Sequence, residues 1–472
     1  MIARERFCLI ARIHGIKSKI IKQKKYLIML ERFKNDVQLH EDAIRHAKDK
    51  GYKLNELNVF YQPESWEILA DMIEEGKYTT GISSQMYRDK ITGEVLSYEK
   101  AQEYKASGRK VRELNVLPAL DRVVWNAFYK MIYERFEGQI HPSCKSYQRG
   151  MGCGKICKEL AQKLSELGHY EGVKTDLTKY FDTVKIEYIN KELEKMKNEA
   201  PSVIWGEIIR SYNDNRLIIN GEVKEVYTSL RQGNPISTIL ANLILRDVDA
   251  EMEKYDCIYM RYSDDAIFIG KQWREAYERF KEMIGEIGLI LNDKKTERIT
   301  DQEWFEFLGF SIKKDKISIS SKTLRNIKIK VKSITTGWSK RQHRVCTEGE
   351  LKKAIRQVQK YFFLDYAKNK SLFGMGVYLY SAVNVEHDII AIDTWIKDSL
   401  RCMMTNKNNI YGLGYVKGRA YCIDDKNIGK NVSANMKKTE GLLEKYGWVS
   451  LNKLKKNYCT SRELFEAEIK KL

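Results

Sequence analysis

The spacing of apolar residues predicts a chain in which helices alternate with short strands. Amphipathic repeats of three and four positions predict helices over residues 121–136, 154–167 and 272–287, and two more around 351–362 and 392–400. The stripes that support four of them are Val124, Phe128, Ile132 and Phe136; Ile156, Leu160 and Leu164; Leu351, Ile355, Val358 and Phe362; and Ile392, Trp395, Ile396 and Leu400. Gly168 is expected to end the helix over 154–167.

The middle of the chain carries a denser pattern. Pro235 is expected to open a helix that continues to Val248, because proline suits the first helical turn and apolar residues follow at helical spacing. Residues 258–269 predict a strand, a turn and a second strand. Val173–Asp176 predicts another strand, which ends on an acidic residue.

Composition and charge narrow the class of protein. The chain has 472 residues, a formal net charge of +19 and a pI of about 9.2. This surplus favours a polyanionic partner such as nucleic acid, although a soluble protein with a basic surface would show the same balance. The length predicts two or three subdomains. The nine scattered cysteines indicate reduced thiols in a cytosolic protein, and no apolar run approaches the roughly 20 residues that cross a bilayer.

Three aspartates form the candidate reaction centre. Asp264 and Asp265 lie at the predicted turn between two apolar strands, and Asp176 ends a strand 88 positions earlier (264 − 176). This separation allows a crossover that places the two strands side by side. Adjacent carboxylates in apolar surroundings are costly unless cations neutralise them, and Mg²⁺ prefers oxygen ligands. A Tyr-x-Asp-Asp turn alone could be an ordinary surface turn, so the prediction depends on Asp176.

Five segments resemble, in the right order, the motifs of the reverse transcriptase family. They are Val173–Val184 (VKTDLTKYFDTV), Leu230–Leu245 (LRQGNPISTILANLIL), Arg261–Phe268 (RYSDDAIF), Gly288–Thr296 (GLILNDKKT) and Phe307–Phe310 (FLGF). They look like the first catalytic-aspartate motif, the Gln-Gly motif of the group II intron type, the catalytic turn, the lysine motif and the primer-grip hairpin. The resemblance covers roughly residues 110–312. It implies an RNA-directed DNA polymerase that uses two Mg²⁺ ions, with Mn²⁺ as the alternative.

The resemblance also assigns roles to single residues. It implies that the metal ions are held by Asp176, Asp264, Asp265 and Leu177. Lys295 would lie near the pyrophosphate as a cation or proton donor, and its alternative is a solvated lysine. The residues expected to contact the incoming nucleotide or template are Phe181, Gln232, Gly233, Arg112 and Arg122.

Phe181 stands where the family places the residue that abuts the sugar of the incoming nucleotide. A large ring there would clash with a 2′-hydroxyl, the group that distinguishes RNA from DNA, so the resemblance favours dNTPs. The alternative is a core aromatic. Two positions depart from the group II pattern, namely Ser263, where alanine is commoner, and Thr238, where proline is usual. Neither removes an expected metal ligand.

The implied fold is α+β, a right-hand polymerase with fingers, a palm with an antiparallel sheet, a helical thumb and a helical C-terminal extension. We expect a basic N-terminal arm at residues 1–60, fingers and palm at 61–312, a thumb at 313–410 and the extension at 411–472. Residues 316–347 hold nine Lys or Arg and no acid, which suits a groove for a template–primer duplex. The expected partners are an RNA template, the DNA product and dNTPs, with a homo-oligomer left open, in the cytoplasm.

Three functions compete. Val116–Gly152 resembles diversity-generating and defence-associated enzymes, which favours a bacterial antiviral enzyme that copies a dedicated non-coding RNA. The Gln-Gly motif favours instead a group II intron protein that also assists splicing. An RNA-binding assembly factor would retain its function without Asp264 and Asp265, whereas a polymerase would lose it. An RNA-dependent RNA polymerase is disfavoured by Phe181.

Overall fold

The computed structural model describes the main body of the chain in two compact units. The described residues are 29–49, 54–90, 93–226, 229–342, 345–363, 374–406, 409, 411–416, 419–424 and 439–470. Residues 1–28 of the predicted basic arm lie outside them. The first unit contains residues 1–149, 173–268 and 272–297, and the second contains 150–172, 269–271 and 298–472. In the described part, no helix is both long and apolar enough to cross a membrane.

The first unit is built around one central helix, α6 (Ala119–Phe136). Its Val124, Phe128, Ile132 and Phe136 are buried, as the predicted spacing requires. Against it packs α2 (Val37–Asp49). The other helices of this unit are α3 (Leu54–Leu57), η1 (Asn58–Tyr61), α4 (Pro63–Glu74), α5 (Tyr98–Ala106), η2 (Glu137–Gln139), α8 (Tyr180–Thr183), α9 (Ile186–Glu199), α10 (Ile204–Asn213), α11 (Ser237–Ile244), α12 (Arg246–Met252), α13 (Trp273–Glu286) and η3 (Asp293–Lys295).

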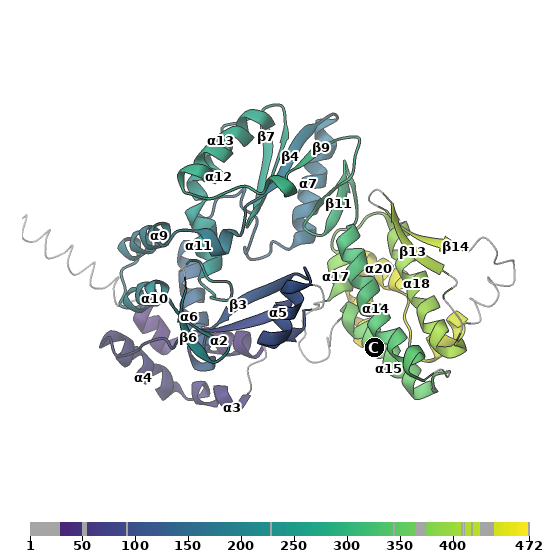
Figure 1. The fold of residues 1–472 in the computed structure, drawn as a ribbon, viewed down its shortest axis with the longest axis horizontal. Coiled ribbons are helices and arrows are strands. Elements are labelled where there is room, and N and C mark those ends of the chain that lie inside the picture. The colour runs from purple at the N-terminus through teal and green to yellow at the C-terminus, as the bar shows by residue number, and fades with distance from the viewer. Residues whose placement is uncertain are drawn as a thin grey trace, which may run out of the picture. The chain divides into compact units, whose positions relative to one another are not determined.

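Two sheets position the candidate site. The first contains β1 (Ser84–Asp89), β2 (Val95–Leu96), β3 (Val111–Val116), β5 (Arg216–Ile219) and β6 (Glu222–Glu225), and β1 pairs antiparallel with β3 along its whole length. The second has the order β7-β8-β4-β9 and contains β4 (Glu171–Asp176), β7 (Cys257–Tyr262), β8 (Asp265–Gly270) and β9 (Glu297–Thr300). Figure 1 shows β4, β7 and β9 in one layer, with α12 and α13 nearby. The predicted crossover therefore brings β4 and β8 together as neighbouring strands.

The second unit contains a three-stranded sheet, β10-β11-β12, a two-stranded sheet, β13-β14, and a set of helices. Its strands are β10 (Phe305–Phe307), β11 (Phe310–Lys313), β12 (Lys316–Ile319), β13 (Tyr411–Val416) and β14 (Arg419–Asp424). Its helices are α7 (Cys153–Leu167), α14 (Ser321–Gln342), α15 (Glu348–Phe363), α17 (Met375–Tyr380), α18 (Glu386–Thr405), α20 (Leu451–Thr460) and α21 (Arg462–Lys470). The mixed α+β class with antiparallel sheets is confirmed. The hairpin β13–β14 lies where a helical extension alone was expected.

One predicted element is wrong in detail. The continuous helix from Pro235 to Val248 begins only at Ser237 and breaks at Leu245 into α11 and α12. In an unbroken helix the carbonyl of Asn242 would accept from the amide of Arg246. Here the guanidinium Nη2 of Arg261 donates to that carbonyl at 3.3 Å. The break follows because a side chain has replaced a backbone donor.

Candidate active site

The strands β7 and β8 form a tight hairpin that carries Asp264 and Asp265. Only Ser263 and Asp264 separate the two strands, and Ser263 adopts a φ of 59°. A left-handed residue is what a two-residue turn between antiparallel strands needs, and serine reaches it at some cost because it has a side chain. The turn must therefore be held by contacts around it.

A buried ion pair beneath the turn supplies those contacts. Arg261 and Asp249 are both fully buried, and the guanidinium donates from Nε to Oδ1 at 2.7 Å and from Nη2 to Oδ2 at 2.6 Å. The same guanidinium donates from Nη1 to the carbonyl of Ser263 at 3.1 Å. Tyr259 donates its hydroxyl to Asp249 Oδ1 at 2.7 Å. Arg261 thus ties the turn to α11 and α12 through one rigid, planar group.

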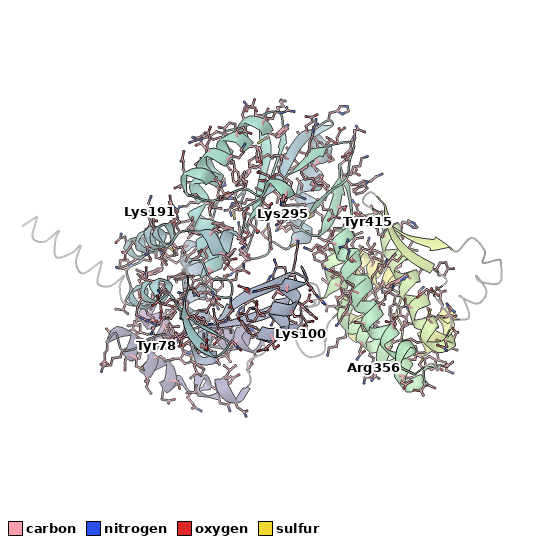
Figure 2. The ribbon with its side chains drawn as sticks, viewed as in Figure 1. Tyr78, Lys100, Lys191, Lys295, Arg356 and Tyr415 are labelled. Carbon is pink, nitrogen blue, oxygen red and sulfur yellow. The ribbon has the colours of Figure 1, made fainter. Side chains whose placement is uncertain are left out.

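Asp176 reaches the turn from the neighbouring strand. The amide of Leu177 donates to the carbonyl of Asp264 at 2.9 Å, so the backbone after β4 is fixed against the hairpin tip. The amide of Asn292 donates to the carbonyl of Asp176 at 2.8 Å. Lys295 donates from Nζ to Asp176 Oδ2 at 2.6 Å, and Figure 2 labels it on the segment between α13 and β9. The structure therefore brings together residues of three separate motifs, at Asp176, Asp264 and Lys295.

The carboxylates repel one another where they meet. Burial raises the pKa of Asp264, and the charge of Asp176 raises it further. Burial, followed by the charges of Asp264 and Asp176, raises the pKa of Asp265 to about 6. Lys295 opposes both shifts. A cation would relieve this repulsion more fully than one exposed lysine.

The donor set fits a hard divalent ion. It consists of carboxylate oxygens, which Mg²⁺ prefers, and substrate phosphates and water supply the remaining ligands in sites of this kind. Among the described residues no group of three or more His, Cys, Asp or Glu side chains is gathered closely enough to hold a metal ion unaided. Asp176, Asp264, Asp265 and Leu177 remain the predicted metal-holding residues.

A cavity of about 910 Å³ opens in front of Asp176 and Asp264. Of the predicted site residues it is lined by Arg112, Asp176, Leu177, Phe181, Gln232, Gly233, Asp264 and Lys295. Asp265 and Arg122 do not line it. Basic and polar residues that the sequence reasoning missed also line it, among them Lys90, Asn115, Tyr147, Lys179 and Asn292. Lys179 and Asn292 lie inside two of the motifs but had no role assigned, whereas Lys90, Asn115 and Tyr147 lie outside the five motifs, so only the fold shows that they reach the cavity.

Contacts at Gly233 and from Arg122 hold the Gln-Gly loop in place. A Cβ on Gly233 would lie 2.3 Å from the carbonyl oxygen of Asn115, and the residue adopts a φ of 116°. The amide of Asn115 also donates to the carbonyl of Gln232 at 2.6 Å. Arg122 is buried and donates from its guanidinium to the carbonyl of Gly233. Glycine is required here for close backbone approach.

Aromatic rings form one wall of the cavity. The ring of Phe181 meets that of Tyr147 edge-on, with centroids 6.4 Å apart, and that of Tyr180 at 5.8 Å. The ring centroid of Tyr147 also lies 6.3 Å from that of Tyr262, and its hydroxyl lies near the side chain of Ser263. Phe181 is therefore held from two sides at the cavity wall, and the sugar-selecting role proposed for it stays a prediction.

The comparisons with known proteins agree with the motifs. Residues 104–312 match the family model described as reverse transcriptase (RNA-dependent DNA polymerase). That range contains all three aspartates, Phe181, the Gln-Gly loop and Lys295. A comparison with curated proteins gives no match.

Solved structures similar to the chain include three telomerase structures. An apo telomerase from Candida tropicalis is 11% identical over 71% of this chain and 66% of that one, with a TM-score of 0.42. The same telomerase truncated from its C-terminal domain is 13% identical over 55% and 60%, with a TM-score of 0.37. Telomerase from Candida albicans in complex with a TWJ fragment of telomeric RNA is 10% identical over 77% and 63%, with a TM-score of 0.35. The chain spans 60–66% of the length of these structures.

Proposed function

We propose that the protein makes cDNA on an RNA template by metal-assisted nucleotidyl transfer, because residues 104–312 match the reverse transcriptase family model. The observation that carries the proposal is the meeting of Asp176, Asp264 and Lys295 in one cavity, with Asp265 immediately behind the turn. The pKa values of Asp264 and Asp265 are raised by burial and by the neighbouring carboxylates, and cations would complete a site of this kind.

The predicted site residues would divide the work of this reaction among them. The aspartates and Leu177 would hold two Mg²⁺ ions, or Mn²⁺, which activate a 3′-hydroxyl and neutralise the leaving pyrophosphate when bound. Arg112 presents a guanidinium suited to the triphosphate. Lys295 pairs with Asp176 and is free to turn to the pyrophosphate once cations neutralise that carboxylate. Phe181 excludes a 2′-hydroxyl, and Gln232 and Gly233 support the template and nucleotide.

The biological role that we propose is bacterial antiviral defence, in the cytoplasm, with a dedicated non-coding RNA as template. The support is the resemblance of Val116–Gly152 to defence-associated enzymes. The second candidate is a group II intron protein, favoured by the sequence Leu230–Leu245. A purified chain carries the answer in its bound RNA, because the two functions differ in which RNA they copy.

The test begins with the protein purified together with its nucleic acid. The RNA is sequenced, and Mg²⁺ and each labelled dNTP are then added to wild type, Asp264→Asn and Asp247→Asn. Asp247 is the matched control, because its side chain is 92% exposed. Labelled DNA from wild type and Asp247→Asn, but not from Asp264→Asn, supports the polymerase. A short non-coding RNA supports defence, an intron supports splicing assistance, and no incorporation on any template contradicts the proposal.

A further inference from the structure

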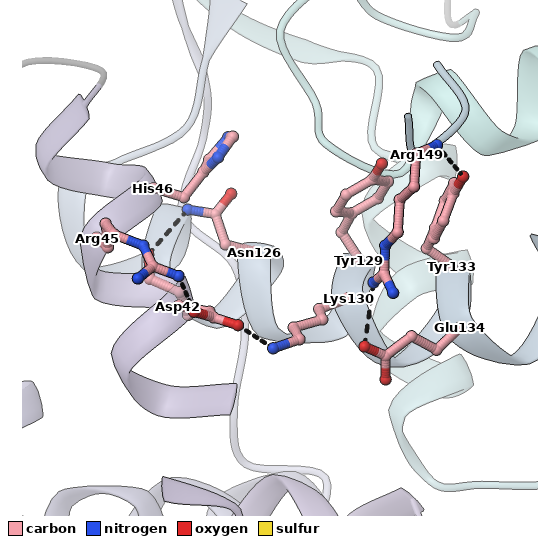
Figure 3. Close-up of a pocket in the computed structure, with 10 residues that line it drawn as sticks. Asp42, Arg45, His46, Asn126, Tyr129, Lys130, Tyr133, Glu134 and Arg149 are labelled. Carbon is pink, nitrogen blue, oxygen red and sulfur yellow. Dashed lines mark hydrogen bonds and ion pairs between the residues drawn. The ribbon is translucent and has the colours of Figure 1, made fainter. Parts of the chain in front are cut away.

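A second pocket lies between α2 and α6, apart from the catalytic cavity. Its volume is about 400 Å³, and none of its lining residues lines the catalytic cavity. Figure 3 shows the side chains that surround it, which are Asp42, Arg45 and His46 from α2, Asn126, Tyr129, Lys130, Tyr133 and Glu134 from α6, and Arg149. This volume falls within the range of small-ligand sites, which is about 300–1,000 Å³.

The pocket is formed where a polar face of α6 lies opposite α2. Asn126, Tyr129, Lys130, Tyr133 and Glu134 are spaced three and four residues apart, so they form one stripe along the helix. A stripe that faces another helix is ordinarily apolar. Here the facing residues of α2 are polar as well, and the two helices enclose a polar space where apolar packing would be expected.

Asn126 gives this pocket an unfilled hydrogen-bonding position. Its side chain is only 4% exposed, and Nδ2 donates to the carbonyl of Ala43 at 3.3 Å. Its Oδ1 is buried and accepts no hydrogen bond from the described residues. Exchanging the amide nitrogen and oxygen would set two acceptors against each other at Ala43, so the orientation is determined. A buried acceptor without a donor is costly, which points to a ligand that supplies an N–H or O–H.

The rest of the lining suits an aromatic, anionic ligand. Tyr129 is partly buried, and its ring centroid lies 5.7 Å from that of Tyr133. Arg149 lies over the Tyr133 ring at 5.0 Å and pairs with Glu134 at 3.0 Å. Arg45 and Lys130 both pair with Asp42. Three cations and two acids therefore surround one aromatic face, which leaves positive charge for a phosphate.

We propose that this pocket binds a nucleotide, with a base N–H on Asn126 Oδ1, the base against Tyr129 and the phosphate near Arg149. Bases that are unstacked from a strand are held in this manner by aromatic rings and side-chain amides. The nucleotide comes either from an unpaired stretch of bound RNA or from solution. The first source rests on the proposed function, and the second does not.

The pocket is linked to the catalytic cavity through one contact. The hydroxyl of Tyr129 lies near the side chain of Thr238, and Thr238 lines the catalytic cavity. A strand that leaves the catalytic cavity on this side would pass Tyr129. An unpaired template nucleotide is therefore the source that the structure favours.

Binding is measured without metal ions or dNTPs, so that polymerisation has no part in the result. One arm titrates the full chain with AMP, GMP, CMP and UMP. The other uses a primer–template duplex with an RNA 5′ overhang, in which single overhang bases are removed one at a time. Asn126→Ala and Arg149→Ala are compared with Arg135→Ala, an exposed arginine of α6 outside the pocket.

We expect removal of one overhang base to weaken binding about tenfold in wild type and in Arg135→Ala, and not in Asn126→Ala. Arg149→Ala, which changes an exposed side chain, should weaken binding without altering the fold. If Asn126→Ala lowers affinity tenfold only in the mononucleotide arm, the pocket is assigned to a free nucleotide. If neither arm distinguishes Asn126→Ala from wild type, the pocket holds only water and the proposal is wrong. A chain that fails to make cDNA but passes the mononucleotide arm refutes the proposed function alone.

Discussion

Replacing Arg261 with methionine should destabilise the first unit by about 3–5 kcal/mol, the usual cost of breaking a buried ion pair. The substitution leaves Asp249 fully buried with only the Tyr259 hydroxyl as an identified donor among the contacts described above. It also removes the donor from the carbonyls of Ser263 and Asn242. The same change at Arg279 should cost far less, because Arg279 forms a surface ion pair whose partner, Glu282, is 64% exposed.

The free energy of opening is best measured by native-state hydrogen exchange of the amides of β7, which belong to the first unit. This choice matters because two units need not unfold in a single step. The double variant Arg261→Met with Asp249→Leu should recover most of the loss, since no charge then remains buried alone. In cDNA synthesis, both variants should be slower than wild type, because each removes the donor to the catalytic turn at Ser263.

Two results would refute this reasoning. One is a cost at Arg261 no larger than the cost at Arg279, which would mean that the pair is solvated in solution. The other is a double variant less stable than Arg261→Met, which would mean that Asp249 is stabilised by something other than the guanidinium. If Arg261→Met is destabilised but keeps full polymerase activity, then Arg261 is not needed to position the catalytic turn at Ser263.

Three further predictions concern the candidate active site. Gly233→Ala should lower dNTP incorporation at least about tenfold, because the new methyl would meet the Asn115 carbonyl, whereas Gly206→Ala, with open space around it, should not. Asp265→Asn should stabilise the metal-free protein by up to about 3 kcal/mol at pH 7.5. The reason is that the pKa of Asp265 is raised from 3.8 to about 6 in the folded protein, so its buried charge disfavours folding above that pH. Thermal melts should show about half of this gain at pH 5, and saturating Mg²⁺ should make the variant less stable than wild type. Phe181→Val should raise the incorporation of rNTPs relative to dNTPs by about tenfold or more in single-nucleotide assays, and an unchanged ratio would return Phe181 to a packing role.

The elements with long, regular apolar repeats were predictable from the sequence alone. The stripe of α6, the end of α7 at Gly168 and the hairpin β7–β8 agree with their spacing because local pattern and tertiary burial act in the same direction. The helix after Pro235 was not predictable in full. Its break at Leu245 depends on Arg261, which is distant in sequence and whose burial no periodicity reveals.

The candidate site shows the same division. Order and spacing of motifs were enough to place Asp176 beside Asp264, because a crossover has few routes between neighbouring strands. Arg122 was expected at the nucleotide, yet the structure has it buried under the Gln-Gly loop. The sequence of a helix does not show which way an arginine side chain points, and the position of the loop that Arg122 contacts is known only from the structure. The polar face of α6 was hidden for a related reason, since Asn126 and Tyr129 gain meaning only opposite α2.

The long sequence separation within the catalytic cavity has a consequence for synthesis of the protein. The ion pair of Lys295 with Asp176 joins residues 119 positions apart, and Asn115 meets a loop that is made more than a hundred residues later. A growing chain folds its N-terminal parts first, and contacts of this range form only when the later segment exists. Helix α6 can therefore be in place while the carboxylates are still unassembled. A nascent or truncated chain that stops before Lys295 would lack a complete cavity. The candidate active site can therefore assemble only late in synthesis of the protein.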